Sequence, residues 1–284
     1  MSGAAGTAVG PMVIAAVEQH HPRVRRLLDD PLAASVLPPV SRWVARLARR
    51  PRVREWLVDA SERNAPGIWG GIACRKRYID DQVVRALADG IGSVVVLGAG
   101  LDTRGHRLVA PAGATAFEVD LPANVERRRG RLGDRDGVVP VPVDLDTGDL
   151  GAALAAHGHR VGDRCLFVWE GVTQYLTEEG FLRTFDFLAG AAPGSRVVFT
   201  YVRHDFVDGS DRYGADALHR RFVTRQRLWR IGVRPRDVAG LLAGYGWRKV
   251  EDVGTEEFLA RYVRPTGREV AVSPLERTVL GEKL

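Results

Sequence analysis

The feature that most constrains this chain is a short apolar run that ends in a glycine turn. Residues 94–97 are all apolar, and Gly98-Ala99-Gly100 follow directly. Asp120 comes twenty positions after Gly100, behind a second apolar run. A buried strand, a turn that lets the backbone approach a ligand, and a carboxylate that can accept hydrogen bonds from a ribose are the parts of a nucleotide-binding βαβ unit. We therefore expect a nucleotide-containing ligand at this turn.

The sequence around this turn alternates between two kinds of segment. Short runs rich in β-branched residues predict strands over residues 93–97, 115–119, 138–143, 164–169 and 196–201. Stretches with helical spacing separate them, over residues 102–110, 122–131, 152–156 and 177–191. Regular alternation of this kind predicts a doubly wound α/β fold, with a mostly parallel sheet covered by helices on both faces.

The segments outside this alternation suggest two additions to the sheet. Residues 1–88 mix apolar and basic side chains at helical spacing and predict an N-terminal helical cap, with the core over residues 89–284. Residues from about 203 to 236 are polar, with a helical stretch over 221–229, and predict either a lid over the sheet or a plain surface connection. A helix opening at Pro235, a strand over 247–253 and a last strand within 268–280 complete seven strands.

Composition limits the classes of protein to consider. The 284 residues are 45% hydrophobic, which is enough for one large core, but no stretch reaches the roughly 20 apolar residues of a membrane span. The start lacks the pattern of a signal peptide, so we expect a cytoplasmic protein without a membrane partner.

Charge and cysteine content exclude two kinds of site. The net charge is +6, but acidic residues accompany the basic ones, and Arg127-Arg128-Arg129 are expected on a solvated helix face. No nucleic-acid partner is predicted. Cys74 and Cys165 are far apart, so we expect two buried thiols and no metal site.

Details of the glycine turn discriminate between cofactors. A dinucleotide fingerprint would place a glycine or alanine three positions after Gly100, where this chain has Thr103. Asp102 would repel a pyrophosphate, but it suits the amine and sulfonium of S-adenosyl-L-methionine (SAM). Tyr245 and Lys249 have the spacing of a dehydrogenase pair, yet two glycines flank the tyrosine and argue for a helix end. The turn therefore favours SAM over a nicotinamide cofactor.

Four ordered motifs then carry a family resemblance. VVVLGAGLDTRGHRL, FEVDLPA, VPVDL and FVWEGVTQYLTEEG stand in this order, with DDPLAASVL and CRKRYIDDQV before them. Together they resemble the leucine carboxyl methyltransferase family, and in particular its bacterial branch of small-molecule O-methyltransferases from secondary metabolism. The resemblance implies the class I fold of SAM-dependent methyltransferases.

The resemblance also implies the cofactor site, position by position. Arg75 matches the arginine that pairs with the methionyl carboxylate of SAM, and Glu170 matches an acid near the methionyl amine and the transferred methyl. The remaining positions are the turn with Gly98, Gly100 and Asp102, the ribose site at Asp120 and Leu121, and the adenine site at Asp144 and Leu145.

The methyl acceptor is less constrained than the cofactor. The chain lacks the extended regions that members of the family acting on a protein phosphatase would need, so we expect a small acceptor methylated on a carboxylate or hydroxyl oxygen. Candidate acceptor-binding residues are Tyr175, Tyr201, Arg203 and Trp229, with Trp169 and Phe206 as further apolar walls.

Several alternatives stay open at this stage. A carboxylate acceptor needs no base, whereas other acceptors would use a catalytic group, for which Glu170, Tyr175 and His204 are the candidates. The alternatives are C- or N-methylation of a small aromatic metabolite, an NAD-dependent oxidoreductase, and a SAM-binding protein without catalysis. The protein is expected to be a monomer or a homodimer.

Overall fold

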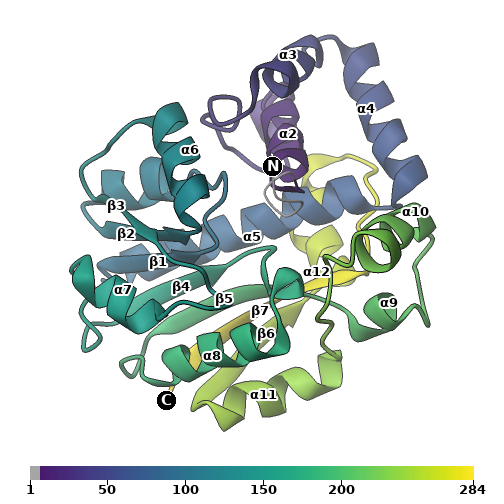
Figure 1. Ribbon diagram of the computed structural model, residues 1–284. Helices are drawn as coiled ribbons and strands as arrows, with labels where there is room; N and C mark the ends of the chain where they lie inside the picture. Colours follow the sequence, from purple (N-terminus) through teal and green to yellow (C-terminus); the bar gives the residue numbers. More distant parts are fainter. Residues whose placement is uncertain (1–6) are drawn as a thin grey trace.

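Seven strands form one mixed sheet in the computed structural model, which describes residues 7–284 (Figure 1). Their order is β3-β2-β1-β4-β5-β7-β6, and β7 alone runs opposite to the other six strands of this sheet. The prediction of a doubly wound, mostly parallel sheet is confirmed. The strands are β1 (Ser93–Leu97), β2 (Thr115–Asp120), β3 (Val138–Pro142), β4 (Cys165–Trp169), β5 (Arg196–Val202), β6 (Trp247–Val253) and β7 (Glu276–Lys283).

Helices precede, connect and follow these strands. Local chemistry sets several of their starts: proline occupies the first turn of α3, α4 and α6, and the side chains of Asp149 and Thr177 cap α7 and α8. Within residues 7–284, no helix combines the length and the apolar character needed to cross a membrane. The helices are α2 (Val9–Glu18), α3 (Pro39–Leu47), α4 (Pro51–Asn64), α5 (Ile68–Ala88), α6 (Pro122–Leu132), α7 (Leu150–Ala156), α8 (Glu178–Ala189), α9 (His204–Asp208), α10 (Asp216–His219), α11 (Val238–Gly244) and α12 (Thr255–Phe258).

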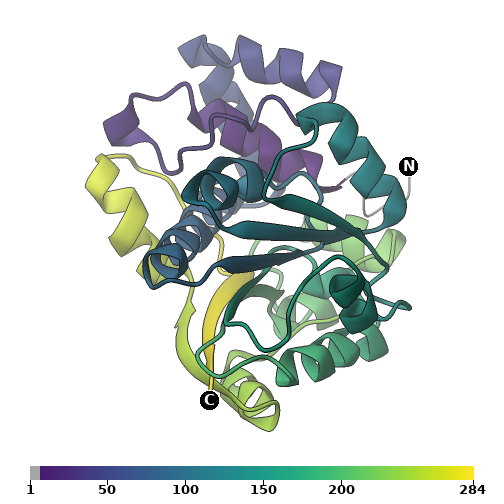
Figure 2. The same ribbon diagram turned by 90° about the vertical axis from the view of Figure 1, so that its left-hand side faces the viewer.

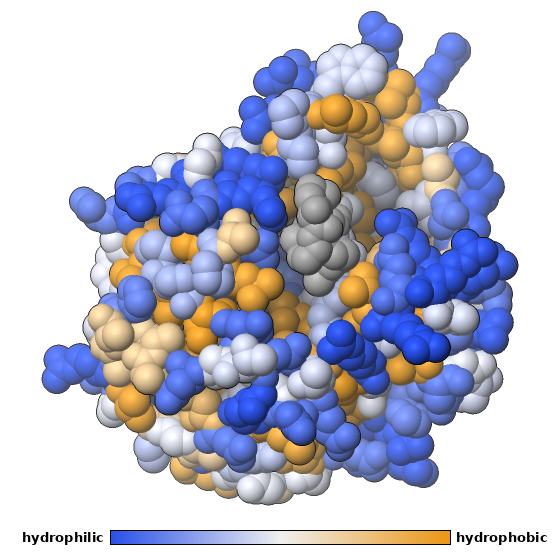
Figure 3. Space-filling model, in the orientation of Figure 1, coloured by the Kyte–Doolittle hydropathy of each residue, from blue (hydrophilic) through white to orange (hydrophobic). Residues whose placement is uncertain are grey.

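The two faces of the sheet carry separate apolar cores. Val94 and Val96 of β1 pack on the side of α2 and α5, whereas Val95 and Leu97 pack on the side of α7, α8 and α11. This alternation follows from the two-residue period of a strand. Figure 2 shows the helical layers on either side of the sheet, and Figure 3 shows that hydrophilic side chains cover most of one outer face. Cys74 and Cys165 are buried and unpaired, as expected.

A buried carboxylate joins the N-terminal helices to the C-terminal part of the chain. Glu18 of α2 is fully buried and accepts hydrogen bonds from the indole of Trp69 at 2.9 Å and from the backbone N–H of Leu27 at 3.1 Å. Arg268 donates to both of its carboxylate oxygens, at 2.7 and 3.1 Å. Burial alone would raise the pKa of Glu18, but Arg268 outweighs it and the pKa is lowered. The ionised side chain therefore fastens α2 to α5 and to residue 268.

The segment after the glycine turn differs from the helix expected over 102–110. Its π-helical turn covers only Gly105–Val109, and a 3₁₀ turn follows over Ala110–Ala112. The Asp102 carboxylate accepts from the N–H of Arg104 at 2.7 Å, and the Thr103 hydroxyl donates to Asp30 at 2.7 Å. These side-chain bonds hold the backbone in a turn and delay the helix.

Two further boundaries also differ from expectation. The helical stretch expected over 221–229 lies earlier in the chain: α10 and a π-helical segment, Arg220–Arg225, together cover residues 216–225, and the chain is irregular over 226–230. The last strand was expected within 268–280 but covers Glu276–Lys283. Before it, the N–H of Ser273 donates to the carbonyl of Gly67 at 2.9 Å, so this part of the chain lies against the start of α5 and does not yet pair with the sheet.

Candidate functional site

The glycine turn has a backbone that only glycine adopts readily. Gly98 has φ +70° and Gly100 φ +50°, and a Cβ on Gly98 would lie 2.4 Å from a methyl carbon of Val172. Asp120, at the end of β2, accepts from the N–H of Gly100 at 2.5 Å through one oxygen. Its other oxygen accepts from the N–H of Leu121 and the amide of Asn124, both at 2.7 Å. The turn and the carboxylate are therefore held together.

A buried arginine contacts the backbone of the glycine turn. Arg128 of α6 is only 6% exposed, forms an ion pair with Glu118 and donates to the carbonyl of Ala99 at 3.4 Å. The expectation of a solvated arginine face is therefore wrong at this position, because the helix turns Arg128 toward the buried carboxylate of β2. Arg129, by contrast, is exposed and pairs with Asp134.

Glu170 lies at the centre of a buried charge cluster directly after β4. Its carboxylate accepts from Arg75 Nε at 2.9 Å and Arg104 Nη1 at 2.6 Å, and Lys76 Nζ lies 3.3 Å away. Burial would raise the pKa of Glu170, but the three cations outweigh it and hold the pKa well below its usual range. An ionised carboxylate in this state is a poor proton acceptor.

Arg104, like Lys76, is a residue of this cluster that the sequence analysis missed. Its side chain is 1% exposed and reaches Asp80 of α5 at 2.6 Å, Asp102 of the turn, and the carbonyl of Lys76 at 3.1 Å, besides Glu170. The signal was present in the sequence as an arginine four positions after Gly100, but a basic residue there is compatible with an exposed helix start. Besides Asp102, its partners come from two distant segments, α5 and the residues after β4, which spacing along the chain does not reveal.

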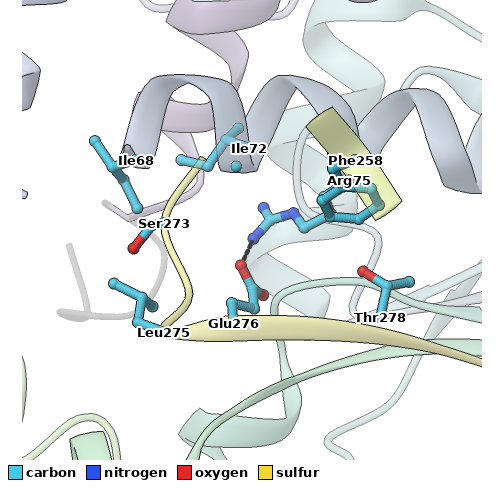
Figure 4. Close-up of a pocket in the computed structure, with 9 residues that line it drawn as sticks. Ile68, Ile72, Arg75, Phe258, Ser273, Leu275, Glu276 and Thr278 are labelled. Atoms are coloured by element: carbon cyan, nitrogen blue, oxygen red, sulfur yellow. Dashed lines mark hydrogen bonds and ion pairs between the residues drawn. The ribbon is translucent and has the colours of Figure 1, made fainter. Parts of the chain in front are cut away.

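Arg75 lies between two carboxylates from different strands. Its Nε binds Glu170, and its Nη1 forms an ion pair with Glu276 at the start of β7 (Figure 4). Its Nη2 lies beside Gly171, where a Cβ would be 3.5 Å from it. Because β7 is antiparallel, Glu276 pairs with Val202 at the end of β5 and so reaches the edge at which the parallel strands end.

The residues expected around the adenine follow β3 at the same edge. Leu145 is 9% exposed, and the Asp144 carboxylate accepts from the N–H of Asp146 at 2.8 Å. The N–H of Val143 donates to the carbonyl of Asp120 at 2.9 Å, which joins the ends of β2 and β3. The structure thus brings the predicted cofactor residues together along the carboxyl ends of β1 to β4.

The residues expected around the acceptor divide into two groups. Tyr175 donates to the hydroxyl of Thr7 at 2.9 Å, and its ring meets that of Trp229 edge-on, with centroids 6.4 Å apart. Trp229 also stacks on Phe222, 5.2 Å between centroids, and contacts Phe206. These side chains form an aromatic group between the end of β4 and the segment that follows α10.

The other three side chains make different contacts. Tyr201 is fully buried on the face covered by α8 and α11, where its hydroxyl donates to Asp252 at 3.0 Å. Arg203 pairs with Asp205 at 2.6 Å, and His204 Nε2 lies 3.2 Å from Asp208 within α9. The structure therefore does not bring Tyr201, Arg203 or His204 into contact with the Glu170 cluster.

Comparison with known proteins places this geometry in a family. The sequence profile described as leucine carboxyl methyltransferase matches residues 8–189. A candidate SAM-dependent methyltransferase of Streptomyces avermitilis is 32% identical over 270 residues, which cover 93% of this chain and 89% of the relative. A similarly named protein of Streptomyces coelicolor is 31% identical over 252 residues, 87% of this chain and 83% of the relative.

Solved structures resemble the fold as well. A crystal structure described as a candidate methyltransferase from Thermobifida fusca superposes with a TM-score of 0.59 at 17% identity, covering 94% of this chain and 97% of the other. A second, a DUF574 family protein of Streptomyces avermitilis, has a TM-score of 0.58 at 11% identity and covers 95% and 97%. At these identities the likeness concerns the fold alone.

Proposed function

The chain belongs to the leucine carboxyl methyltransferase family and is a SAM-dependent methyltransferase, and we propose that it methylates an oxygen of a small acceptor. The acceptor group is a carboxylate or a hydroxyl, and the reaction belongs to secondary metabolism. The observation that carries this proposal is the buried Glu170 cluster beside the glycine turn. In this cluster the Glu170 carboxylate, which can bind a cationic group, lies in direct contact with Arg75, which can bind an anionic group.

The charges of the cluster suit the methionyl end of SAM. Glu170 would accept from the amine, and Arg75, through the Nη2 beside Gly171, would bind the carboxylate. Asp120 would bind the ribose hydroxyls, and Asp144 with Leu145 would flank the adenine. Each of these side chains is already fixed by neighbours, so little reorganisation is needed on binding.

In catalysis the main task of the protein is then to align the acceptor with the cofactor, and little acid–base or covalent chemistry is required of its side chains. SAM, when bound, supplies a methyl group on a positively charged sulfur. The residues of this chain hold the cofactor, exclude water and place the acceptor oxygen in line with the carbon–sulfur bond. A carboxylate acceptor needs no base. The low pKa of Glu170 makes it unsuited to deprotonate a hydroxyl, and burial raises the pKa of Tyr175, which keeps its phenol protonated. A hydroxyl acceptor would therefore need His204 as its base, and in this structure His204 lies beside Asp208, apart from the Glu170 cluster.

The wider setting belongs to the same proposal. We place the protein in the cytoplasm, as a monomer or homodimer that takes a small-molecule acceptor and no nucleic acid. Tyr175 and Trp229 would line the acceptor side, because their rings meet near the end of β4. Methylation of nitrogen or carbon on a small aromatic metabolite is the alternative outcome of an acceptor screen.

Replacement of Asp120 tests the cofactor assignment. Asp120→Ala should weaken binding of SAM by about 1.5–3 kcal/mol, because the ribose would lose a charge-assisted hydrogen bond. Calorimetric titration with SAM and S-adenosylhomocysteine (SAH), and with NADH as the competing ligand, measures this directly.

The matched control is Asp134→Ala, since that carboxylate is exposed and pairs only with exposed Arg129 among the described residues. The control should bind SAM as the natural protein does. Equal affinity in the Asp120 variant, or tight binding of NADH, would contradict the assignment.

A further inference from the structure

A cavity lies beside Arg75, between the first turns of α5 and the start of β7 (Figure 4). It contains about 280 Å³ of empty space, part of which is open to solvent. Ile68 and Ile72 of α5, Phe258 of α12 and Leu275 form apolar walls. None of its lining residues comes from the glycine turn, β2 or β3, so the cavity lies outside the predicted ribose and adenine sites.

Three polar atoms in this cavity lack a hydrogen-bond partner among residues 7–284. They are Ser273 Oγ, Glu276 Oε1 and Thr278 Oγ1, and all three are buried. Ser273 is 5% exposed and Thr278 is 1% exposed, so bulk water does not readily serve them. A buried polar atom without a partner destabilises a protein by about 1–3 kcal/mol. A polar ligand group that enters the cavity would therefore find buried acceptors among its lining residues.

The chemistry of these atoms limits that group. Glu276 Oε1 can only accept when ionised, and Arg75 already serves the other oxygen of the same carboxylate. The hydroxyls of Ser273 and Thr278 can accept as well. A ligand group that donates is therefore favoured, whereas a carboxylate would meet the negative charge of Glu276.

We propose that this cavity binds a hydroxyl or protonated amine of the methyl acceptor and so anchors it beside the cofactor. The inference rests on the proposed function and adds to it the class of group that the acceptor must carry. The enclosed part of the cavity has room for about one water-sized group, so it can take a single hydroxyl or amine and not the rest of the acceptor. The group held here is distinct from the oxygen that receives the methyl.

The test compares donor and acceptor probes on the complex with SAH. Calorimetry first establishes SAH binding, because its absence would contradict the proposed function and not this inference. Saturation-transfer NMR then measures binding of benzyl alcohol, benzylamine and benzoate. We expect the alcohol and the amine to bind in the cavity. Benzoate that binds at the methyl-accepting position instead is recognised because changes in the cavity leave its affinity unchanged.

Variants locate the probe in the cavity. Thr278→Val and Ser273→Ala should each weaken benzylamine binding about five- to tenfold and leave SAH affinity unchanged. Thr278→Ser keeps the hydroxyl and should bind the probe as the natural protein does, which separates a lost contact from a lost fold.

Four results would overturn the proposal. They are failure of benzyl alcohol and benzylamine to bind the SAH complex, benzoate binding that Thr278→Val weakens as it weakens benzylamine binding, equal probe affinity in the valine and alanine variants, and loss of probe binding in Thr278→Ser with SAH affinity retained.

Discussion

Glu18 and Glu170 are both buried, ionised carboxylates held by arginine, but their partners are arranged differently. Glu18 receives four hydrogen bonds, and among the described residues it is the only carboxylate that pairs with Arg268. Glu170 faces three cations, and two of them have other carboxylates: Arg75 also pairs with Glu276, and Arg104 with Asp80 and Asp102.

The difference separates a structural carboxylate from a ligand-binding one. Glu18 is the only carboxylate that serves Arg268 among the described residues, so removing its charge leaves the largely buried guanidinium with only the carbonyl of Arg25 as an acceptor. At Glu170 the arginines keep a partner when that charge is removed or shared with a ligand. Redundant pairing at the end of a strand thus allows a carboxylate to serve a ligand without endangering the fold.

The largest expected effect is the loss of stability when Glu18 is replaced. Glu18→Gln should lower the free energy of unfolding by about 3–5 kcal/mol, because it leaves the largely buried Arg268 guanidinium without a carboxylate. Urea unfolding followed by circular dichroism measures the loss. Glu170→Gln, as the matched variant, should lose less, and a greater loss there would reverse the comparison.

The next largest effect is the loss of cofactor affinity when Glu170 is replaced. Glu170→Gln should weaken SAM binding by about 1.5–3 kcal/mol, since the amine would lose its charged acceptor. Titration calorimetry on the folded variant gives the value. The Glu18→Gln protein, kept below its unfolding midpoint, should bind SAM normally, and weakened binding in that control would show that the two regions are coupled.

The smallest effect is a dependence of stability on pH that arises near Glu18. Burial, together with Arg268, lowers the pKa of His21 to about 4, whereas an unfolded histidine has a pKa near 6.5. The unfolded chain therefore binds more protons between these values, and stability present above about pH 6.5 is lost as the pH falls toward 4. Thermal unfolding at pH 7 and pH 5 should show a lower midpoint at pH 5.

A histidine variant assigns this effect. His21→Gln should reduce the loss between pH 7 and pH 5, whereas His157→Gln, at an exposed position, should leave it unchanged. Equal pH profiles for all three proteins would exclude His21 as the source. SAM affinity should not follow the same profile, because Glu170 stays ionised over this range.

The sequence predicts best those features that depend on local spacing. The strands could be identified because their pattern repeats along the chain. The glycine turn and Asp120 could be identified because each stands at the end of a predicted strand. Arg104 could not, since its partners Asp80 and Glu170 lie 24 and 66 positions away. The start of the last strand was misplaced because the contact between Ser273 and Gly67 is tertiary and leaves no period in the sequence.

The acceptor side shows the same limit. Tyr201 lies in a strand, where a change of one position reverses the face, and its neighbours Phe199 and Asp252 fix it away from the cluster. No sequence motif includes the cavity residues Ser273, Glu276 and Thr278. Only the folded chain shows that they share a cavity with Arg75.

The position of β7 has a consequence for how the protein is made. It is the last strand of the sheet in sequence, yet it lies between β5 and β6, which emerge earlier during synthesis. An intermediate without β7 would have an open seam in the sheet and no Glu276 beside Arg75. A cofactor that recognises the finished cluster would therefore bind only chains in which this seam has closed, and so favour complete folding by mass action.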